Sequence, residues 1–318
     1  MTTSLITYES RISDWLLDLL YAQWRALGTP LSAAPPASGE VIDPEALLWC
    51  SLEFFPTQPR LCEQVLGWLA RNDEYLLRPR VRKLARDLGD PRTSIWQVLD
   101  PEWKVAIEPP SRCCYGQNPA EPVSAFTRDL GWRSRQAGLL RQQPGTPESA
   151  PTTLILRARD ALGADAKHFI LVYLLGTGGG ARLRSIAQWS GQSYRNISKT
   201  AQRWEAAKIL TLEHGHARLR NLAVWSTLLE IDTRDIVLLD WLRLYEACLK
   251  LLRSLAKAGA RSLPADGPVV ASLLREARTS VSASVEGQPL LPSETVRSFT
   301  RMLLGLPAAS AAPTTSPA

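Results

Sequence analysis

Residues 181–221, ARLRSIAQWSGQSYRNISKTAQRWEAAKILTLEHGHARLRN, contain the pattern that decides the fold of the chain. Their apolar spacing predicts one helix from about Arg184 to Ser190 and a second helix from about Tyr194 to Ala207. Gly191 lies between these helices, where glycine takes a positive φ in a tight turn without steric cost. Ser193 is the expected N-cap of the second helix, because its hydroxyl can accept from an unpaired backbone N–H.

The second helix has an apolar face and a polar face. Ile197, Ala201 and Trp204 recur at i, i+4 and i+7, as in an amphipathic helix. The opposite face carries side chains that can donate to a phosphate or to a base edge: Arg195, Asn196, Ser198, Lys199, Gln202 and Arg203. Beyond the helix, alternation over Ile209–Glu213 and a return over Ala217–Asn221 predict a two-stranded wing.

The positive charge of the chain is concentrated in this stretch. Residues 181–220 contain eight basic residues, which are Arg182, Arg184, Arg195, Lys199, Arg203, Lys208, Arg218 and Arg220. Because the only acidic residues there are Glu205 and Glu213, the stretch carries a net charge of +6. The complete chain also carries +6, so the other residues sum to zero. A local positive field of this kind attracts a polyanion.

Over residues 164–222 the chain resembles the winged helix-turn-helix of bacterial regulators of the MarR and ArsR type. The matching residues are Ile186-Ala187, Ser190-Gly191, Ser193, Ile197-Ser198 and the run Trp204–Ile209. The chain departs from the family at Lys208, where glycine is often found, so the resemblance does not fix the end of the second helix. The resemblance implies a three-helix fold with that helix in the major groove and the wing along the backbone or in the minor groove.

From the charge and the resemblance we expect a sequence-specific transcriptional regulator, a repressor acting as a homodimer, that binds double-stranded DNA. The residues expected to contact base edges are Arg195, Asn196, Lys199 and Gln202. Those expected to contact phosphates are Ser193, Tyr194, Ser198 and Arg203. The wing adds His216, Arg218 and Arg220, and the basic surface is completed by Arg182 and Arg184.

Two other functions fit the same sequence. Winged helices also serve as protein-interaction modules, so the chain is alternatively an autoregulating antitoxin or a scaffold partner in a toxin or phage-defence system. The helical mass around a small module favours this alternative, and Trp189 is then either an anchor for a protein partner or a core residue. The third function is a ligand-responsive repressor with an effector pocket among the tryptophans of the N-terminal helices. Phosphate-driven binding weakens steeply with salt and an apolar interface does not, which separates the first two functions.

The expected fold class is mostly α, with a central winged helix-turn-helix and a small β-wing flanked by helical regions. The chain divides into an N-terminal helical domain (1–103), a connector (104–153), the winged domain (154–229), a C-terminal helical region (230–306) and a disordered tail (307–318). Helices over Leu154–Leu162 and Ala166–Leu175 are expected to begin the winged domain.

Several helices are predicted outside the winged domain, at residues 9–27, from Pro44, at 60–70, at 268–285 and at 293–306. Residues 78–98 combine an apolar face with the basic residues Arg80, Arg82, Lys83 and Arg86. We favour a scaffold helix with a solvated basic face there, over a degenerate second helix-turn-helix. A long helix over 234–258, capped by Asp232-Thr233, either mediates dimers or packs on the N-terminal helices.

The sequence predicts no enzyme, no cofactor and no metal site. Of three histidines, His214 and His216 fall at the expected wing tip, too few for a hydrolase triad or a metal site. His168 is interpreted as a packed or surface residue and not as a ligand. Five cysteines without CxxC spacing indicate reduced thiols in a cytoplasm. We expect no secretory signal and no transmembrane helix.

Overall fold

The computed structural model describes residues 5–31, 39–55, 57–88, 151–260, 267–282 and 293–304. This part of the chain is mostly helical, as the sequence predicts, and it contains one small antiparallel sheet with three strands where two were predicted. The predictions for residues 91–98, for most of the connector and for the tail lie outside the described residues. None of the described helices combines the length and the apolar character that crossing a bilayer requires.

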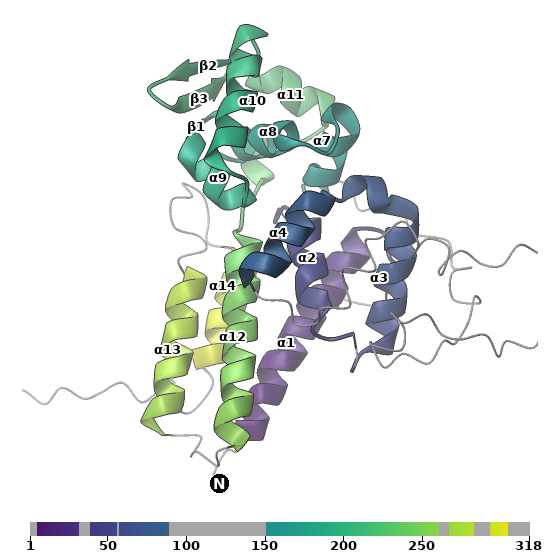
Figure 1. The fold of residues 1–318 in the computed structure, drawn as a ribbon, viewed down its shortest axis with the longest axis vertical. Helices are drawn as coiled ribbons and strands as arrows, with labels where there is room; N and C mark the ends of the chain where they lie inside the picture. The colour runs from purple at the N-terminus through teal and green to yellow at the C-terminus, as the bar shows by residue number, and fades with distance from the viewer. Residues whose placement is uncertain are drawn as a thin grey trace, which may run out of the picture.

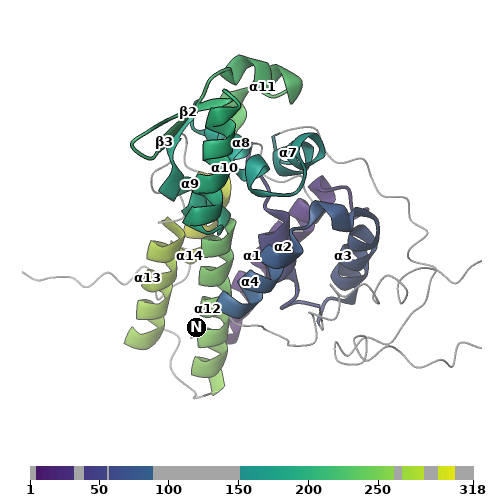
Figure 2. The same ribbon diagram turned by 45° about the horizontal axis from the view of Figure 1, so that its top comes forward.

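The molecule has two parts (Figure 1). We call residues 151–238 the central module, and the described residues of 5–88 and 239–304 the helical body. The module lies at one end of the body, and the turned view in Figure 2 shows the same arrangement. Each part is organised around its own cluster of buried apolar side chains.

Helices from both ends of the described chain build the helical body. They are α1 (Leu5–Ala26), α2 (Pro44–Ser51), α3 (Pro59–Asn72), α4 (Arg78–Leu88), α12 (Trp241–Ala260), α13 (Pro268–Ser282) and α14 (Glu294–Leu304). Asp43 caps α2 by accepting from the Ala46 backbone N–H at 3.1 Å, and Pro44 occupies the first helical position, as the sequence predicts.

Residues that the sequence analysis assigned to separate N-terminal and C-terminal regions share the core of the body. Ile12, Leu16 and Leu20 are fully buried along α1, and α12 packs along this helix within the same chain. Tyr245 of α12 donates its hydroxyl hydrogen to the Gln23 side chain at 2.5 Å. The apolar stripe of α12 is therefore buried inside one chain. The homodimer stays a prediction, and it would have to form through another surface.

The long helix predicted over 234–258 begins later than expected. Residues Thr233–Asp235 form a single 3-10 turn, and α12 starts only at Trp241. The chain between them is extended because Val237 pairs with the segment before α2, with Val41 N–H donating to Val237 O at 3.0 Å. The neighbouring side chains of Ile236 and Leu238 are buried in the core of the module. Tertiary pairing therefore overrides helix propensity over these residues.

The central module contains five helices and three strands among its described residues. In chain order they are α7 (Leu154–Leu162), α8 (Ala166–Gly176), β1 (Gly180–Arg182), α9 (Leu183–Ser190), α10 (Tyr194–Ala206), β2 (Leu210–Glu213), β3 (His216–Leu219) and α11 (Leu222–Leu228). Helix α8 is buried along almost its whole length, and α7, α9 and α10 pack around it. The predicted bounds of α7, α8 and α10 agree with these to within one residue.

The sheet has the strand order β1-β3-β2, with both pairs antiparallel. Strands β2 and β3 form the predicted hairpin, whereas β1 was not predicted. A strand of three residues is too short to show an alternating pattern. Its pairing with β3 becomes visible only when the sheet is assembled.

Lys208 explains how α10 ends without the glycine often found in the resembled family. Lys208 has a φ of 58°, the left-handed conformation that glycine adopts most readily. Its N–H donates to Glu205 O at 2.9 Å, and Ile209 N–H donates to Trp204 O at 2.9 Å. These two bonds satisfy carbonyls of the last helical turn, so α10 ends at Ala206 and the chain enters β2.

Candidate nucleic-acid interface

The apolar face of α10 fixes which of its side chains point outward. Ile197 and Ala201 are fully buried against the module, as the sequence predicts, and Trp204 is 5% exposed. The Trp204 ring stacks on Trp225 of α11 with centroids 6.3 Å apart and planes within 9°. These contacts leave the opposite face of α10 directed to solvent.

The side chains predicted to contact DNA are accessible in the structure. On α10 and its cap, those of Ser193, Tyr194, Arg195, Asn196, Lys199, Gln202 and Arg203 are exposed, and Ser198 is half-buried. Those of Arg182, Arg184, His216, Arg218 and Arg220 are exposed as well. No part of the described chain covers the outer face of α10, so the helix is open to a groove.

The start of α10 is held by the cap that the sequence predicts. Ser193 Oγ accepts from the Asn196 backbone N–H at 3.2 Å, and Gly191 takes the turn at a φ of 65°. A Cβ added at Gly215 would lie 4.0 Å from the Tyr194 hydroxyl oxygen. The first turn of α10 and the tip of the β2–β3 hairpin are therefore neighbours.

Strand β1 brings Arg182 to the hairpin, which the sequence analysis did not foresee. In the antiparallel register Arg182 lies opposite His216, and Gly180 lies opposite Arg218. Residues directly opposite in such a ladder share one face of the sheet. Ala217 is buried on the other face, so the sheet presents its cationic side chains to solvent.

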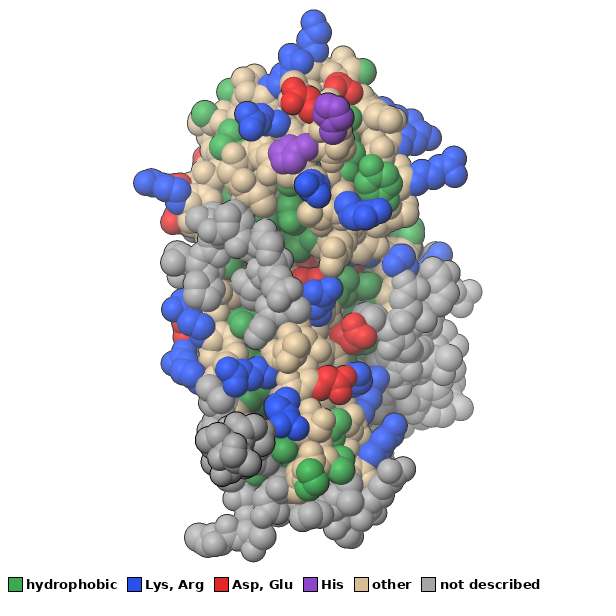
Figure 3. Space-filling model, turned by 90° about the vertical axis from the view of Figure 1, so that its left-hand side faces the viewer, with side chains coloured by type: hydrophobic (Ala, Val, Ile, Leu, Met, Phe, Trp, Pro, Cys, Tyr) green, Lys and Arg blue, Asp and Glu red, His purple; other side chains and the backbone are tan. Residues whose placement is uncertain are grey.

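The basic residues of this interface have no acidic partners in the described part of the chain. None of the eight basic residues between 181 and 220 forms an ion pair with a carboxylate of the described residues. One of the two acidic residues, Glu205, instead accepts from the Leu212 backbone N–H at 3.1 Å. Figure 3 shows Lys and Arg side chains spread over this end of the molecule around the histidines. The surface therefore carries uncompensated positive charge.

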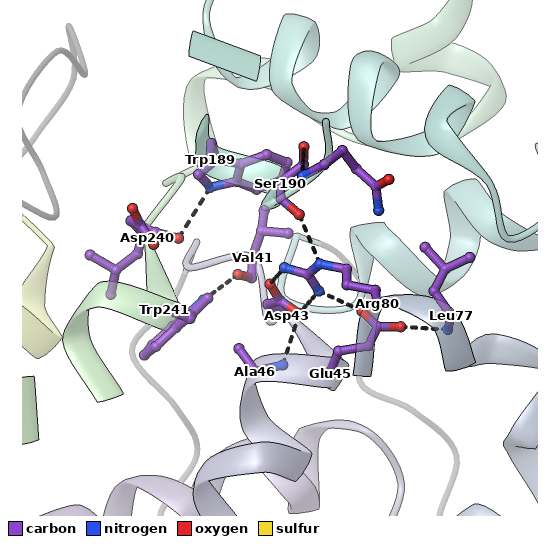
Figure 4. A network of polar contacts seen from close by, with 12 residues as sticks. Val41, Asp43, Glu45, Ala46, Leu77, Arg80, Trp189, Ser190, Asp240 and Trp241 are labelled. Carbon is purple, nitrogen blue, oxygen red and sulfur yellow. Dashed lines mark hydrogen bonds and ion pairs between the residues drawn. The ribbon is translucent and has the colours of Figure 1, made fainter. Parts of the chain in front are cut away.

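Arg80 ties the helical body to the turn before α10 (Figure 4). The prediction that Arg80 lies on a solvated face of α4 is wrong, because its side chain is buried and the residue is 2% exposed. Its Nε donates to the Ser190 carbonyl oxygen at 2.8 Å, and its other nitrogens bond Asp43 and Glu45. A cation beside the last carbonyls of α9 is favourable because the helix dipole is negative there. Arg82 of the same helix is exposed, as predicted.

Glu45 lies at the centre of this buried charge network, which we define as Asp43, Glu45, Arg80 and Arg159. Both Glu45 carboxylate oxygens accept from Arg159 of α7, at 2.7 and 2.9 Å. Two guanidinium groups and two carboxylates sum to zero, so the charges compensate one another in the core. Burial alone would raise the pKa of Glu45, but Arg159 and Arg80 lower it to about 2.

Trp189 adds a further contact between module and body, and Trp241 adds a contact within the body beside it. Trp189 of α9 donates its Nε1–H to Leu239 O at 3.2 Å, and Trp241 of α12 donates to Val41 O at 2.6 Å (Figure 4). Trp189 also packs on Tyr173 with ring centroids 5.4 Å apart. Of the two predicted roles for Trp189, anchor for a partner or core residue, the structure shows the core residue. The orientation of α9 and α10 is thus fixed by the body.

His168 is a buried residue that receives a hydrogen bond from the network. Its Nε2 accepts from Arg159 Nε at 3.0 Å, and its ring lies 4.0 Å from that of Phe169. Burial, followed by the positive charge of Arg159, holds the pKa of His168 well below 6.5. The ring is therefore neutral in the folded protein near pH 6, where an unfolded chain would bind a proton.

The buried neutral state of His168 predicts a pH dependence of stability. Because the folded-state pKa is depressed, the unfolded chain binds the extra proton, and stability falls as pH drops below about 6.5. Urea denaturation should show a loss of about 1.4 kcal/mol between about pH 7.5 and pH 5.5 from this residue. His168→Gln retains an acceptor for Arg159 and does not titrate, so its profile should be flatter by this amount. Equal pH slopes for the two proteins would contradict the assignment.

The chain matches no protein-family model, no curated protein and no solved structure. Within the described residues, no group of three or more His, Cys, Asp or Glu side chains is arranged to hold a metal ion. The chemistry available at this surface is that of an exposed cationic helix beside a cationic hairpin.

Proposed function

We propose that residues 154–229 form a winged helix-turn-helix and that the protein is a sequence-specific, double-stranded DNA-binding repressor of transcription. The order α8-β1-α9-α10-β2-β3, with a tight turn between α9 and α10, supports this proposal. The observation that carries it is the exposed basic surface, whose cations have no carboxylate partners among the described residues. Such a surface gains free energy by replacing the counterions of a phosphate backbone.

In the proposed complex, α10 enters the major groove with its polar face toward the bases. The groove is about 12 Å wide and admits one helix. Arg195, Lys199 and Gln202 would then meet base edges, while Arg218 on the hairpin would follow the phosphate backbone. The body fixes the angle of α10 through Arg80 and Trp189, so little order is lost on binding.

Arg195→Ala should weaken binding to the specific site far more than binding to bulk DNA. A bidentate contact to guanine O6 and N7 contributes about 1–3 kcal/mol of discrimination, which the alanine variant would lose. Both affinities can be measured by fluorescence anisotropy, with a duplex that contains the specific site and with a duplex of shuffled sequence. Arg275→Ala, which removes an exposed cation from α13, is the matched control. Equal losses of affinity for both duplexes would show that Arg195 contacts the DNA backbone and not the bases.

Selection of bound fragments from genomic DNA, at two salt concentrations, tests the proposed function itself. A repressor should enrich a small set of fragments that share one motif. Fragments without a shared motif, or no fragments at low salt, would contradict sequence-specific binding.

A second candidate function, a protein-interaction module such as an antitoxin or scaffold partner, is favoured by α11. None of its residues is buried, and Val224 and Leu228 are 62% and 61% exposed on one side of the helix. Exposed apolar side chains at i and i+4 fit the surface of a helical partner. Complex formation through these residues would persist at high salt, whereas binding through the basic surface would not.

A further inference from the structure

A pair of amide side chains lies where α10 would meet a base. Gln192 is half-buried in the turn before α10, and Asn196 is exposed in the first turn of that helix. Asn196 Nδ2 donates to Gln192 Oε1 at 3.2 Å. Gln192 precedes the N-cap Ser193, so this bond joins the turn to the first turn of α10.

Gln192 is anchored by the turn itself. Its backbone N–H donates to Ser190 Oγ at 3.3 Å, and that hydroxyl donates to Ile186 O at 2.7 Å. The Ser190 carbonyl in turn accepts from the buried Arg80 at 2.8 Å. The Gln192 backbone is thus joined to the helical body by a short series of hydrogen bonds, which suits a residue that positions another.

We infer that Gln192 orients the Asn196 amide so that Asn196 selects an adenine in the major groove; this inference rests on the proposed function. One Asn196 N–H is taken by Gln192, which leaves one N–H and the carbonyl oxygen facing outward. Adenine presents one acceptor, N7, and one donor, the N6 amino group, which match this pair. Guanine presents two acceptors, N7 and O6, so its O6 would oppose the outward carbonyl of Asn196.

The test compares base preference among variants of Gln192. Duplexes are selected from a random pool, and the contacted position is the one whose preference Asn196→Ala erases. Wild type should favour adenine there by about tenfold over the other bases. Gln192→Ala should reduce this preference to about twofold or less, because the Asn196 amide is no longer oriented.

Two further variants separate orientation from charge. Gln192→Glu keeps an acceptor for Asn196 Nδ2, so it should weaken binding to every sequence while retaining the adenine preference. Gln192→Lys offers only donors, so the Asn196 carbonyl turns toward it and both N–H groups face outward, which should move the preference toward guanine. Gln188→Lys, on the exposed side of α9, changes the net charge equally and should leave the preference unchanged.

The possible failures are distinguishable. If no duplex is bound at any salt concentration, the proposed function fails and the inference fails with it. If a motif is bound but Asn196→Ala removes the preference for a base other than adenine, the proposed function stands and the inference is overturned. If Asn196→Ala removes the preference for adenine but Gln192→Ala keeps it, the positioning role of Gln192 is overturned.

Discussion

Replacing Glu45 with glutamine should lower the free energy of unfolding by about 3–5 kcal/mol, as expected when one member of a buried ion pair is removed. Glu45 is fully buried and bonds Arg80 and Arg159. Glutamine has almost the same shape but no charge, so two guanidinium groups would be left with Asp43 alone. The substitution therefore isolates the charge from the packing.

Urea denaturation at pH 7 measures this loss. The control is Glu276→Gln, because Glu276 pairs with Lys250 at 2.6 Å but both side chains are more than half exposed. Solvent screens such a pair, so the control should unfold close to wild type. Because the pKa of Glu45 is lowered to about 2, its contribution should persist above pH 4.5 and be lost as pH falls toward 2. A Glu45→Gln protein as stable as the control would show that the network does not hold the fold together.

Binding to double-stranded DNA should weaken about 10³-fold between about 50 mM and 200 mM salt if about six of the basic side chains contact phosphates. The physical reason is the release of condensed counterions, which is less favourable when the bulk salt concentration is high. Anisotropy titrations at several salt concentrations give the slope of log K against log salt. A slope near zero would exclude phosphate-driven binding and favour the protein-interaction alternative.

The same titrations locate the contacts. Arg218→Ala combined with Arg220→Ala should reduce the magnitude of the slope by about two, one for each lost phosphate contact. Arg278→Ala removes an exposed cation from α13, in the body, and should leave the slope unchanged. If all of these variants had the same slope, the hairpin would not contact the backbone.

The elements of the interface could be predicted from the sequence because their signals are local. The apolar spacing of Ile197, Ala201 and Trp204, the cap at Ser193 and the turn at Gly191 all lie within one stretch of the chain. Local periodicity and capping define such helices directly. The cationic face of α10 followed from the same spacing, since it is the face opposite the core.

The interactions that hold the interface could not be predicted, because they join distant residues. Arg80 bonds Asp43, 37 positions away, and Ser190, 110 positions away. Beside the other basic residues of its helix, Arg80 has the pattern of a solvated residue, and only the fold shows its carboxylate partners. Gln192 was not among the predicted site residues, because it lies before the N-cap Ser193 and its bond to Asn196 depends on the conformation of the turn.

The pairing of Val41 with Val237 has a consequence for the order of folding during synthesis. Val41 pairs with Val237 at the exit of the central module, and the next residue, Ile42, donates its N–H to Thr152 O at the entry at 2.9 Å, so the module is an insertion within the body. About 170 residues separate the end of α4 from the end of α12. At ribosomal rates of about 5–20 residues per second, roughly 10–30 s pass between the synthesis of α4 and that of α12. During this time the apolar side chains of α1 that pack against α12 are uncovered. The inserted module is contiguous and can reach its native packing first, so chaperones are expected to engage the amino-terminal helices of the growing chain.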